Sequence, residues 1–409
     1  MLNAVRKTFA SLKYRNFRLF WTGQAISLIG TWMQSIGQAW LILKLTDSPF
    51  LLGLIGAAQY TPILLLSMFA GSVVDRFPKR HLVILTQSVM TVLALILWVL
   101  TARHVVTYGA IFVLALLLGM ATSLDVPARQ AFMIDLVGKD SLMNAIALNS
   151  TTFNLARLIG PAVAGLLIAK VGIATTFLLN GVSFIPVIAG LVMIDVDGLP
   201  GASARKKVLE DVKEGLVYIR NNAVVLDVIV LMLIVSLFAF NFNVIVPIYA
   251  KYVFHDDPVI FGFLMSSLGV GSLVGAILVA FRSSRSPNPS YLLAGAVVLS
   301  AFQAVLAFVT GLYLATAVLF LVGLGAIVYT ALSNTTIQLN TPDALRGRVM
   351  SVYAFAFLGI TPVGNLFIGG VAQLAGVRAS IFVGGLLGLA PALYYIKRFF
   401  NLRKENGNP

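Results

Sequence analysis

The chain has 409 residues, of which 59% are hydrophobic and only 11% are charged, whereas a soluble domain carries roughly 25% charged residues. There is no cysteine, which excludes disulfides, thiolate catalysis and cysteine-based metal sites. The net charge of +14 has two explanations, a nucleic-acid partner or a bias of lysine and arginine toward one membrane face, and the positions of the charges decide between them.

Hydropathy predicts twelve membrane-spanning helices, because apolar segments of about 20 residues cross a hydrocarbon core ~30 Å thick with their backbone polar groups satisfied internally. We therefore expect an all-α membrane protein with spans at residues 17–43, 50–74, 82–102, 107–127, 144–169, 174–194, 223–250, 259–281, 290–309, 312–339, 347–373 and 378–398. The first 20 residues lack the apolar core and cleavage site of a signal peptide, so we expect none.

The positive charges predict the orientation. With the N-terminus inside, the lysines and arginines on the outer side are Lys44, Arg103, Lys170, Lys251 and Arg378. Arg157 lies inside a span, and the other 23 of the 29 fall in cytoplasmic segments. This bias predicts a multi-pass protein of the cell (inner) membrane with both termini in the cytoplasm, and it explains the net charge without nucleic acid.

Polar residues recur every three or four positions along span 1 and form one stripe on an otherwise apolar helix. The stripe comprises Gln24, Ser27, Thr31, Gln34, Ser35 and Gln38, and smaller polar sets occur in span 2 (Gln59, Tyr60), span 7 (Asn241, Asn243) and span 11 (Thr361, Asn365). Such residues must face protein or water. They are therefore candidates to line a substrate cavity, and hydrogen bonds between helices are the alternative for each.

The segment Gly71–Arg80 interrupts two apolar runs with clustered charges and Pro78. Charges of this density cannot lie in lipid, so the segment is predicted to be a short, sharply turned loop at one membrane face.

Arg157 falls near the middle of span 5, at a depth where insertion of an arginine costs ~2.5–3.5 kcal/mol, so it should face a cavity and find partners. No acid lies at matching depth, because Asp227 is near the start of span 7 and Asp125 near the end of span 4. Two interpretations stay open. Arg157 holds an anionic or polar substrate group through charge-assisted hydrogen bonds, or it pins helices together through Asn154, glutamines and backbone carbonyls.

The longest polar interruption, residues 195–222, divides the chain into a bundle at 1–194, a cytoplasmic linker and a bundle at 223–409. The linker contains Pro200, Gly201 and the cluster Arg205-Lys206-Lys207. After Ser203, apolar residues recur at helical spacing among charges, at Val208, Val212, Leu216 and Ile219. The pattern predicts an amphipathic helix, either lying on the inner membrane surface or solvated.

The two halves are similar. Leu136–Leu142 aligns with Asn340–Leu345, and Pro161 then aligns with Pro362, each at an offset of about 200 residues. Two six-helix repeats with a substrate site between them are a known transporter plan.

Several motifs resemble the major facilitator superfamily. The loop Gly71-Ser-Val-Val-Asp75-Arg76-Phe-Pro-Lys79-Arg80 is similar to its signature loop between helices 2 and 3, with Pro78 in place of the usual glycine. A narrower resemblance, to the branch that includes the enterobactin exporter and macrolide efflux proteins, is carried by Lys13–Phe17, Leu136–Asn144, Gly160–Gly165 and Arg346–Met350.

The resemblance implies a gate. Gly71, Asp75, Arg76, Lys79 and Arg80 would form it, with Asp75 facing the start of helix 11 near Gly347–Ser351 and Asp125 pairing with the basic residues of the loop. Gly160-Pro161 is similar to the helix 5 motif of antiporters, although Ala164 replaces a second glycine.

These features predict a monomeric secondary transporter without metal or cofactor, whose partners are a small-molecule substrate, membrane lipids and, as coupling ion, protons. We expect a proton-coupled exporter of a small amphipathic or anionic molecule such as a siderophore, drug or lipid-like metabolite, working by alternating access. The alternatives are a broad multidrug exporter and a facilitator or lipid transporter without proton coupling. An enzyme would need a nucleophile–base pair or metal ligands at depth, and a transport-dead receptor would differ only in flux.

Overall fold

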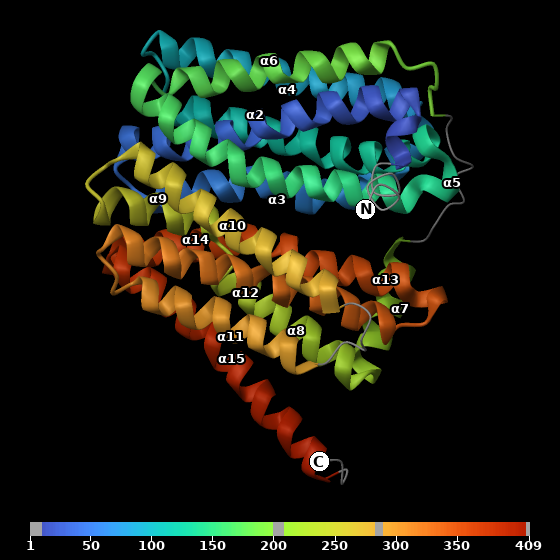
Figure 1. The fold of residues 1–409 in the computed structure, drawn as a ribbon, viewed down its shortest axis with the longest axis vertical. Coiled ribbons are helices and arrows are strands. Elements are labelled where there is room, and N and C mark those ends of the chain that lie inside the picture. The colour runs from blue at the N-terminus through green and yellow to red at the C-terminus, as the bar shows by residue number, and fades with distance from the viewer. Residues whose placement is uncertain (1–9, 199–207, 283–288, 406–409) are drawn as a thin grey trace. The chain divides into compact units, whose positions relative to one another are not determined.

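The computed structural model describes residues 10–198, 208–282 and 289–405 and contains only helices and their connections in this part of the chain (Figure 1). Pro200, Gly201, Ser203 and the cluster Arg205-Lys206-Lys207 lie outside the described residues. The chain divides into two compact units. The first comprises Met1–Thr46 and Ala58–Arg205, and the second comprises Asp47–Ala57 and Lys206–Pro409.

The first unit is built from a 3-10 turn and five helices. They are η1 (Ala10–Lys13), α2 (Arg15–Thr46), most of α3 (Pro49–Arg76), α4 (Lys79–Ala102), α5 (Tyr108–Val171) and α6 (Ala174–Val192). The first residues of α3, up to Ala57, belong to the second unit.

The second unit contains the remaining helices. They are α7 (Val208–Asn221), α8 (Ala223–Phe238), α9 (Phe242–Val253), α10 (Pro258–Arg282), α11 (Pro289–Leu306), α12 (Leu312–Leu339), α13 (Asp343–Ala354), the π-helical turn η2 (Phe355–Gly359), α14 (Thr361–Ala375) and α15 (Val377–Glu405).

Each predicted span coincides with helix, and two predicted spans are interrupted. Spans 4 and 5 are the two halves of α5, which are separated by a kink at Gly138, where the backbone (φ 72°, ψ 174°) is not helical. Span 7 is broken between α8 and α9, where Asn241 Nδ2 donates to the carbonyl of Leu237. Span 11 passes through η2 just before Pro362, which has no N–H to continue the helical ladder.

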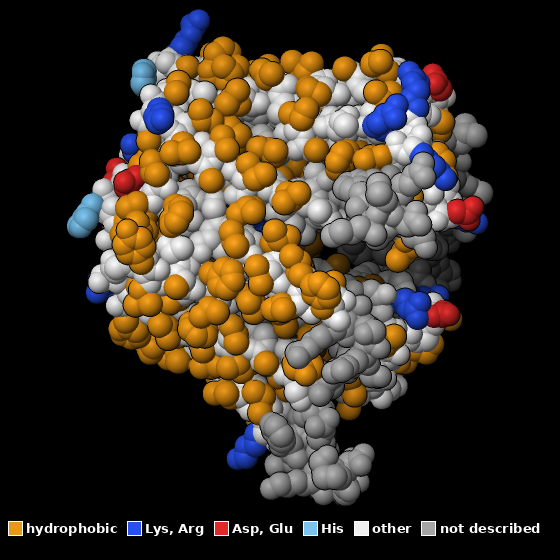
Figure 2. Space-filling model, viewed as in Figure 1, with side chains coloured by type: hydrophobic (Ala, Val, Ile, Leu, Met, Phe, Trp, Pro, Cys, Tyr) orange, Lys and Arg blue, Asp and Glu red, His pale blue; other side chains and the backbone are white. Residues whose placement is uncertain are grey.

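In the described part of the chain, nine helices are long and apolar enough to cross a membrane, counting α5 once. The helix α2 is not among them because its polar stripe lowers its hydropathy, and α11 is shorter, with Ser290–Leu306 as its apolar part. Hydrophobic side chains cover the visible faces of the helices, and charged side chains gather toward the helix ends (Figure 2). The fold is an all-α, multi-pass membrane fold, as expected.

Glycines bring α2 close to α6 at every seventh residue. A Cβ on Gly23 would lie 2.8 Å from Val187 Cα, and one on Gly30 would lie 2.4 Å from Ser183 Oγ. A Cβ on Gly37 would lie 2.1 Å from Thr176 Oγ1. Membrane helices pack mainly through van der Waals contact, so small residues at this spacing hold the two helices together.

The helix packing of the first unit is repeated in the second. In the first unit the helix at span 6, α6, packs against those at spans 1 and 3, α2 and α4. In the second unit α15, at span 12, packs against α8 and α11, at spans 7 and 9. The predicted similarity of the halves therefore appears in how the helices are paired.

Candidate functional site

The polar stripe of α2 has two sides. Gln24, Ser27, Gln34 and Gln38 are buried, whereas Thr31 and Ser35 are exposed. Gln34 Oε1 accepts a hydrogen bond of 2.7 Å from Asn180 Nδ2 on α6, so this glutamine is engaged inside the first unit. The exposed side of the stripe is the side that can meet a ligand.

Arg157 lies against an aromatic surface of the first unit. Its guanidinium carbon is 5.9 Å from the centre of the Trp32 ring on α2. The rings of Trp32 and Phe153 pack edge to face, with their centres 5.8 Å apart. Tyr60 of α3 is close enough to interact with Arg157 electrostatically. Stacking on an aromatic face stabilises a cation away from water by about 0.5–2 kcal/mol.

No described residue forms an ion pair or hydrogen bond with the guanidinium of Arg157, which is partly exposed. Asn154, a predicted partner, instead donates to the backbone carbonyl of Ser150 at 2.8 Å. The residue lies 14 positions before the end of α5 at Val171, about 20 Å along the helix. The donors of a cation at this depth thus remain available for a ligand.

Gly160 and Pro161 lie one turn further along α5 and are buried against α2. A Cβ on Gly160 would be 2.5 Å from Trp32 Cβ and 3.1 Å from the carbonyl oxygen of Ile29. The glycine therefore lets α5 approach α2 and sets the position of Trp32 beside Arg157. Trp32 and Phe153 were not predicted as site residues. Phe153 lies one turn before Arg157 on α5 and follows from helical spacing, whereas Trp32 lies on α2 and depends on how the two helices pack.

Lys79 and Arg80, predicted as loop residues, lie in the first turn of α4, because α3 continues to Arg76 and only Phe77 and Pro78 connect the two helices. Both bind within the first unit. Lys79 Nζ lies 2.9 Å from Asp135 Oδ2 on α5. Arg80 pairs with Asp197 at 2.8 Å, and its Nε and Nη2 atoms donate to the carbonyls of Leu191 and Val192. Arg80 thereby satisfies free carbonyls at the end of α6, which favour a cation.

Asp125 is 1% exposed and has partners other than the expected ones. Its carboxylate accepts hydrogen bonds from Thr86 and Gln87 of α4 and from Arg129, one turn along its own helix. The expected pairing with Arg76, Lys79 or Arg80 is absent from the contacts of the described residues. Asp125 therefore joins α4 to α5 below the signature loop.

Gly71, Asp75 and Arg76 are exposed at the end of α3. The expected partner of Asp75, the start of α13, belongs to the other unit. This gate stays a prediction.

The predicted polar residues of the second unit differ in exposure. Asn243 is exposed in the first turn of α9, whereas Asn365 on α14 is 1% exposed, with both amide atoms lacking a hydrogen-bond partner in the described part of the chain. Gly56, which belongs to the second unit, packs directly on the Asn365 amide. Gln59 in the first unit is half-buried.

Two of the motifs that carry the family resemblance meet in the first unit. Ser11 of η1, just before Lys13–Phe17, bonds to Asn144 Oδ1 through its backbone N–H at 2.9 Å and its hydroxyl at 2.8 Å. Ser141 Oγ lies 3.2 Å from the Tyr14 hydroxyl. The segment before α2 is thus hydrogen-bonded to the second half of α5.

The two helical units, with a polar surface at depth in the first, define a membrane transporter. Among the described residues no group of three His, Asp or Glu side chains could hold a metal. The chain belongs to the transmembrane secretion effector family of the major facilitator superfamily, whose family model matches residues 6–408.

Its relatives are transporters. It is 26% identical to the staphyloferrin A transporter of Staphylococcus aureus over 96% of this chain and 98% of that protein. It is 25% identical to the multidrug efflux pump Tap of Mycolicibacterium fortuitum, over 83% and 85% of the two chains. It is also 25% identical to the enterobactin exporter EntS of Shigella boydii, over 90% and 88%.

Solved structures give the same fold. The nucleoside transporter NupG aligns with a TM-score of 0.73 and 12% identity, covering 95% of this chain and 99% of that one. The family match and the relatives show that the protein is a multi-pass membrane transporter and not an enzyme.

Proposed function

We propose that this transporter exports a small amphipathic or anionic organic molecule from the cytoplasm across the cell membrane, driven by the proton gradient and working by alternating access. The observation that supports it best is the guanidinium of Arg157, held against Trp32 at depth with its donors available. A carboxylate, catecholate or phosphate-like group of the substrate would satisfy those donors through charge-assisted hydrogen bonds.

The aromatic surface supports an amphipathic cargo. Phe153 is 44% exposed, and Trp32 and Tyr60 are half-buried beside the cation, so an apolar ring can stack where the anionic group binds. Relatives named for staphyloferrin A, enterobactin and multidrug efflux support organic cargo of this kind. The alternative, a broad multidrug exporter, is favoured by the same aromatic side chains, because stacking discriminates little between ring systems.

Proton coupling needs a group that exchanges a proton. Asp125 and Asp227 are the candidates, and Asp125 forms an ion pair with Arg129. A facilitator without proton coupling would transport in the absence of a gradient.

The test is transport into everted membrane vesicles, with and without a pH gradient, of one acidic and one cationic amphiphile of similar size. Arg157→Ala should reduce transport of the acid at least about tenfold, because a hydrogen bond to a charged group contributes about 1.5–3 kcal/mol and 1.4 kcal/mol is tenfold. Arg157→Lys keeps the charge but loses the planar fork, so it should recover only part of the loss.

Arg103→Ala, which removes an exposed arginine at the end of α4, is the matched control and should transport as the natural chain does. Normal transport by Arg157→Ala and Arg157→Lys would disprove the substrate role. Transport of the acid that is independent of the gradient would disprove proton coupling while leaving the role of Arg157 intact.

A further inference from the structure

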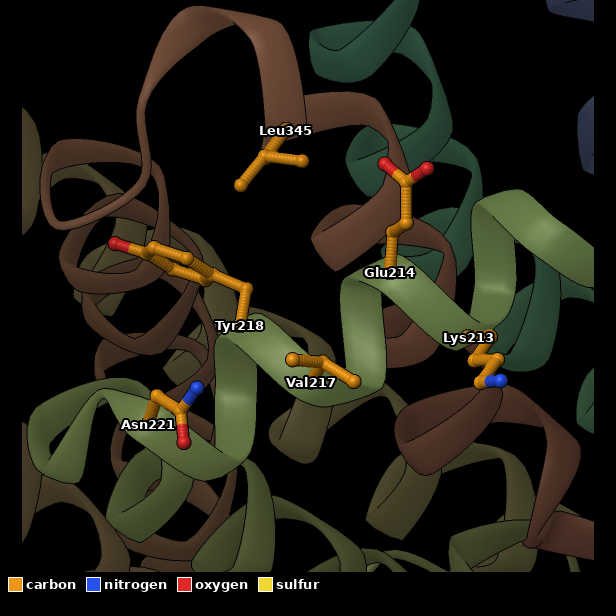
Figure 3. Close-up of a pocket in the computed structure, with 6 residues that line it drawn as sticks. All are labelled: Lys213, Glu214, Val217, Tyr218, Asn221 and Leu345. Carbon is orange, nitrogen blue, oxygen red and sulfur yellow. The ribbon is translucent and has the colours of Figure 1, made fainter.

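A pocket of about 570 Å³ in the second unit offers a ligand charges of both signs. Figure 3 shows Lys213 and Glu214 on its α7 wall, with Leu345 of α13 across from them. Helix α7 is the predicted amphipathic helix, with Ile219 buried, and Glu214 fastens it to α13 through an ion pair with Arg348. This pocket therefore selects no class of ligand, and the surface around the cation of the first unit is more specific.

Arg157 lies on a polar face of α5, and Phe153 shares that face. Ser150, Asn154 and Arg157 follow one another at intervals of four and three residues, which places them on one side of the helix. Phe153 lies one turn before Arg157 and is 44% exposed. Leu155, which is also exposed, lies two residues from Arg157 and so on the opposite side of α5. Phe153 is thus exposed beside the polar residues.

Trp32 contacts both of these side chains from α2. The guanidinium of Arg157 lies over the Trp32 ring, and the rings of Trp32 and Phe153 pack edge to face. Because the cation already covers the Trp32 ring, the ring that is open to a ligand is that of Phe153. Trp32 instead fixes where the donors of Arg157 point.

We propose that the cargo is an aromatic acid, whose ring stacks on Phe153 while its anionic group binds the donors of Arg157. Phe153 and Arg157 are one turn apart, about 5–6 Å between their Cβ atoms, so the anionic group is attached to the ring directly or by a short link. Phe153 determines the preference for a ring, and Trp32 is a positioning residue that acts through Arg157. This names the substrate class of the proposed function and rests on it.

The test is equilibrium binding of two radiolabelled acids to the purified full chain in detergent. They are para-pentylbenzoate and its ring-saturated analogue, pentylcyclohexanecarboxylate, which have the same charge and nearly the same size. The saturated acid is the more apolar, so partition into detergent cannot produce a preference for the aromatic one. The natural chain should bind the aromatic acid about two- to tenfold more tightly, as aromatic pairs do. Phe153→Leu should abolish this preference.

Trp32→Leu should weaken binding of both acids by the same factor, about two- to fivefold, because it removes the cation–π contact that holds Arg157. Trp32→Phe keeps an aromatic face and should recover part of this loss. In a chain that already carries Arg157→Ala, Trp32→Leu should have no further effect. A purely structural role of Trp32 would instead add its loss to that of Arg157→Ala.

Phe308→Leu is the matched control, because Phe308 is also exposed and packs edge to face, on Phe382 of the second unit. It should leave both affinities unchanged. Equal binding of the two acids by the natural chain, a preference that survives Phe153→Leu, or an added loss from Trp32→Leu beside Arg157→Ala would each overturn the inference. Undiminished binding of both acids by Arg157→Ala would instead disprove the proposed function.

Discussion

The carboxylate of Asp125 is held by a cation and two neutral donors inside the first unit, and its side chain is 2% exposed. Removing one partner of a buried pair leaves the other charge uncompensated, at a cost of about 3–5 kcal/mol. Asp125→Ala should therefore lower stability by about 3 kcal/mol, because Arg129 keeps some solvent at 20% exposure. Thermal unfolding of the purified protein in detergent measures this.

A double variant, Asp125→Leu with Arg129→Met, should recover much of that loss, since replacing a whole buried pair by apolar groups is often neutral. A loss as large in the double variant as in Asp125→Ala would show that the pair itself is not the source of the effect.

The contacts of Asp125 show which partners of a residue can be predicted from sequence. Arg129 could be predicted as a partner from its i,i+4 spacing, because residues one turn apart share a helix face. Thr86 and Gln87 could not be predicted as partners, since their contact with Asp125 depends on how α4 is rotated toward α5. Arg157 was found because an arginine at midspan is rare, whereas Trp32 looked like one more apolar position.

Asp47 gives the pH dependence that can be argued from an exposed ion pair. Lys251 lies 2.7 Å from Asp47 Oδ1, and the Tyr252 hydroxyl donates to the same oxygen at 2.8 Å. Lys251 first, and then Tyr252, hold the pKa of Asp47 below its ordinary value of 3.8. The contact therefore stabilises the protein fully above the unfolded-state pKa, near 4, and this contribution is lost as the pH falls through the lower folded-state pKa.

The Asp47 side chain is 73% exposed, so the pair is worth less than about 1 kcal/mol. Asp47→Asn should lower the Tm by no more than about 2 °C, equally at pH 7 and pH 5, and the difference from the natural chain should vanish in stronger acid. Asp256→Asn, an exposed acid nearby, should have no such effect. A difference that grows between pH 7 and pH 5 would contradict this origin.

At the scale of the element, α2 is placed by its glycines more than by its polar stripe. A side chain at Gly30 would meet Ser183 and Asn180 of α6. Asn180 is the residue that donates a hydrogen bond to Gln34. Gly30→Val should separate the two helices, break the Asn180–Gln34 hydrogen bond and lower stability by about 1–3 kcal/mol, as overpacking does. Unfolding in detergent checks it, with Gly109→Ala, whose Cβ meets nothing within 4 Å, as control.

If Gly30→Val and Gly109→Ala unfold at the same temperature, close approach of α2 and α6 does not limit stability.

The polar stripe of α2 shows how far the sequence of one helix can predict its contacts. Its spacing correctly predicted a polar face, but residues three and four apart spread around the helix. Gln34 therefore points toward α6 while Thr31 and Ser35 stay exposed. Only the position of α6 separates the buried members of the stripe from the exposed ones.

At the scale of the molecule, hydropathy and charge bias predicted the helical segments because bilayer thickness fixes their length. The departures come from local backbone chemistry. The side chain of Asn241 donates a hydrogen bond to the carbonyl of Leu237 at the end of α8. Pro362 follows a π-helical turn. The assignment of Asp47–Ala57 to the second unit could not be read from hydropathy, since it depends on the close approach of Gly53 and Gly56 to Asn365 of α14.

Asp75 provides the prediction for the whole transporter. The helix that was expected to begin near Gly347–Ser351 begins at Asp343. If Asp75 favours the closed-inside state through the positive end of this helix, α13, that contact is worth about 0.3–1 kcal/mol for an exposed acid, less than one decade in population. Asp75→Asn should then shift the protein toward the inward-open state. The chain has no cysteine, so a single Thr31→Cys or Ser35→Cys on the exposed side of α2 reports accessibility without background.

A membrane-impermeant maleimide applied from outside should label Asp75→Asn more slowly than the natural chain, by less than about tenfold, and the order should reverse in everted vesicles. Asp140→Asn, another exposed acid, should change neither rate. Because labelling from the two sides must move in opposite directions if the conformational equilibrium shifts, a change of the same sign from both sides would indicate local loosening of α2. Unchanged rates from both sides would remove Asp75 from the gate.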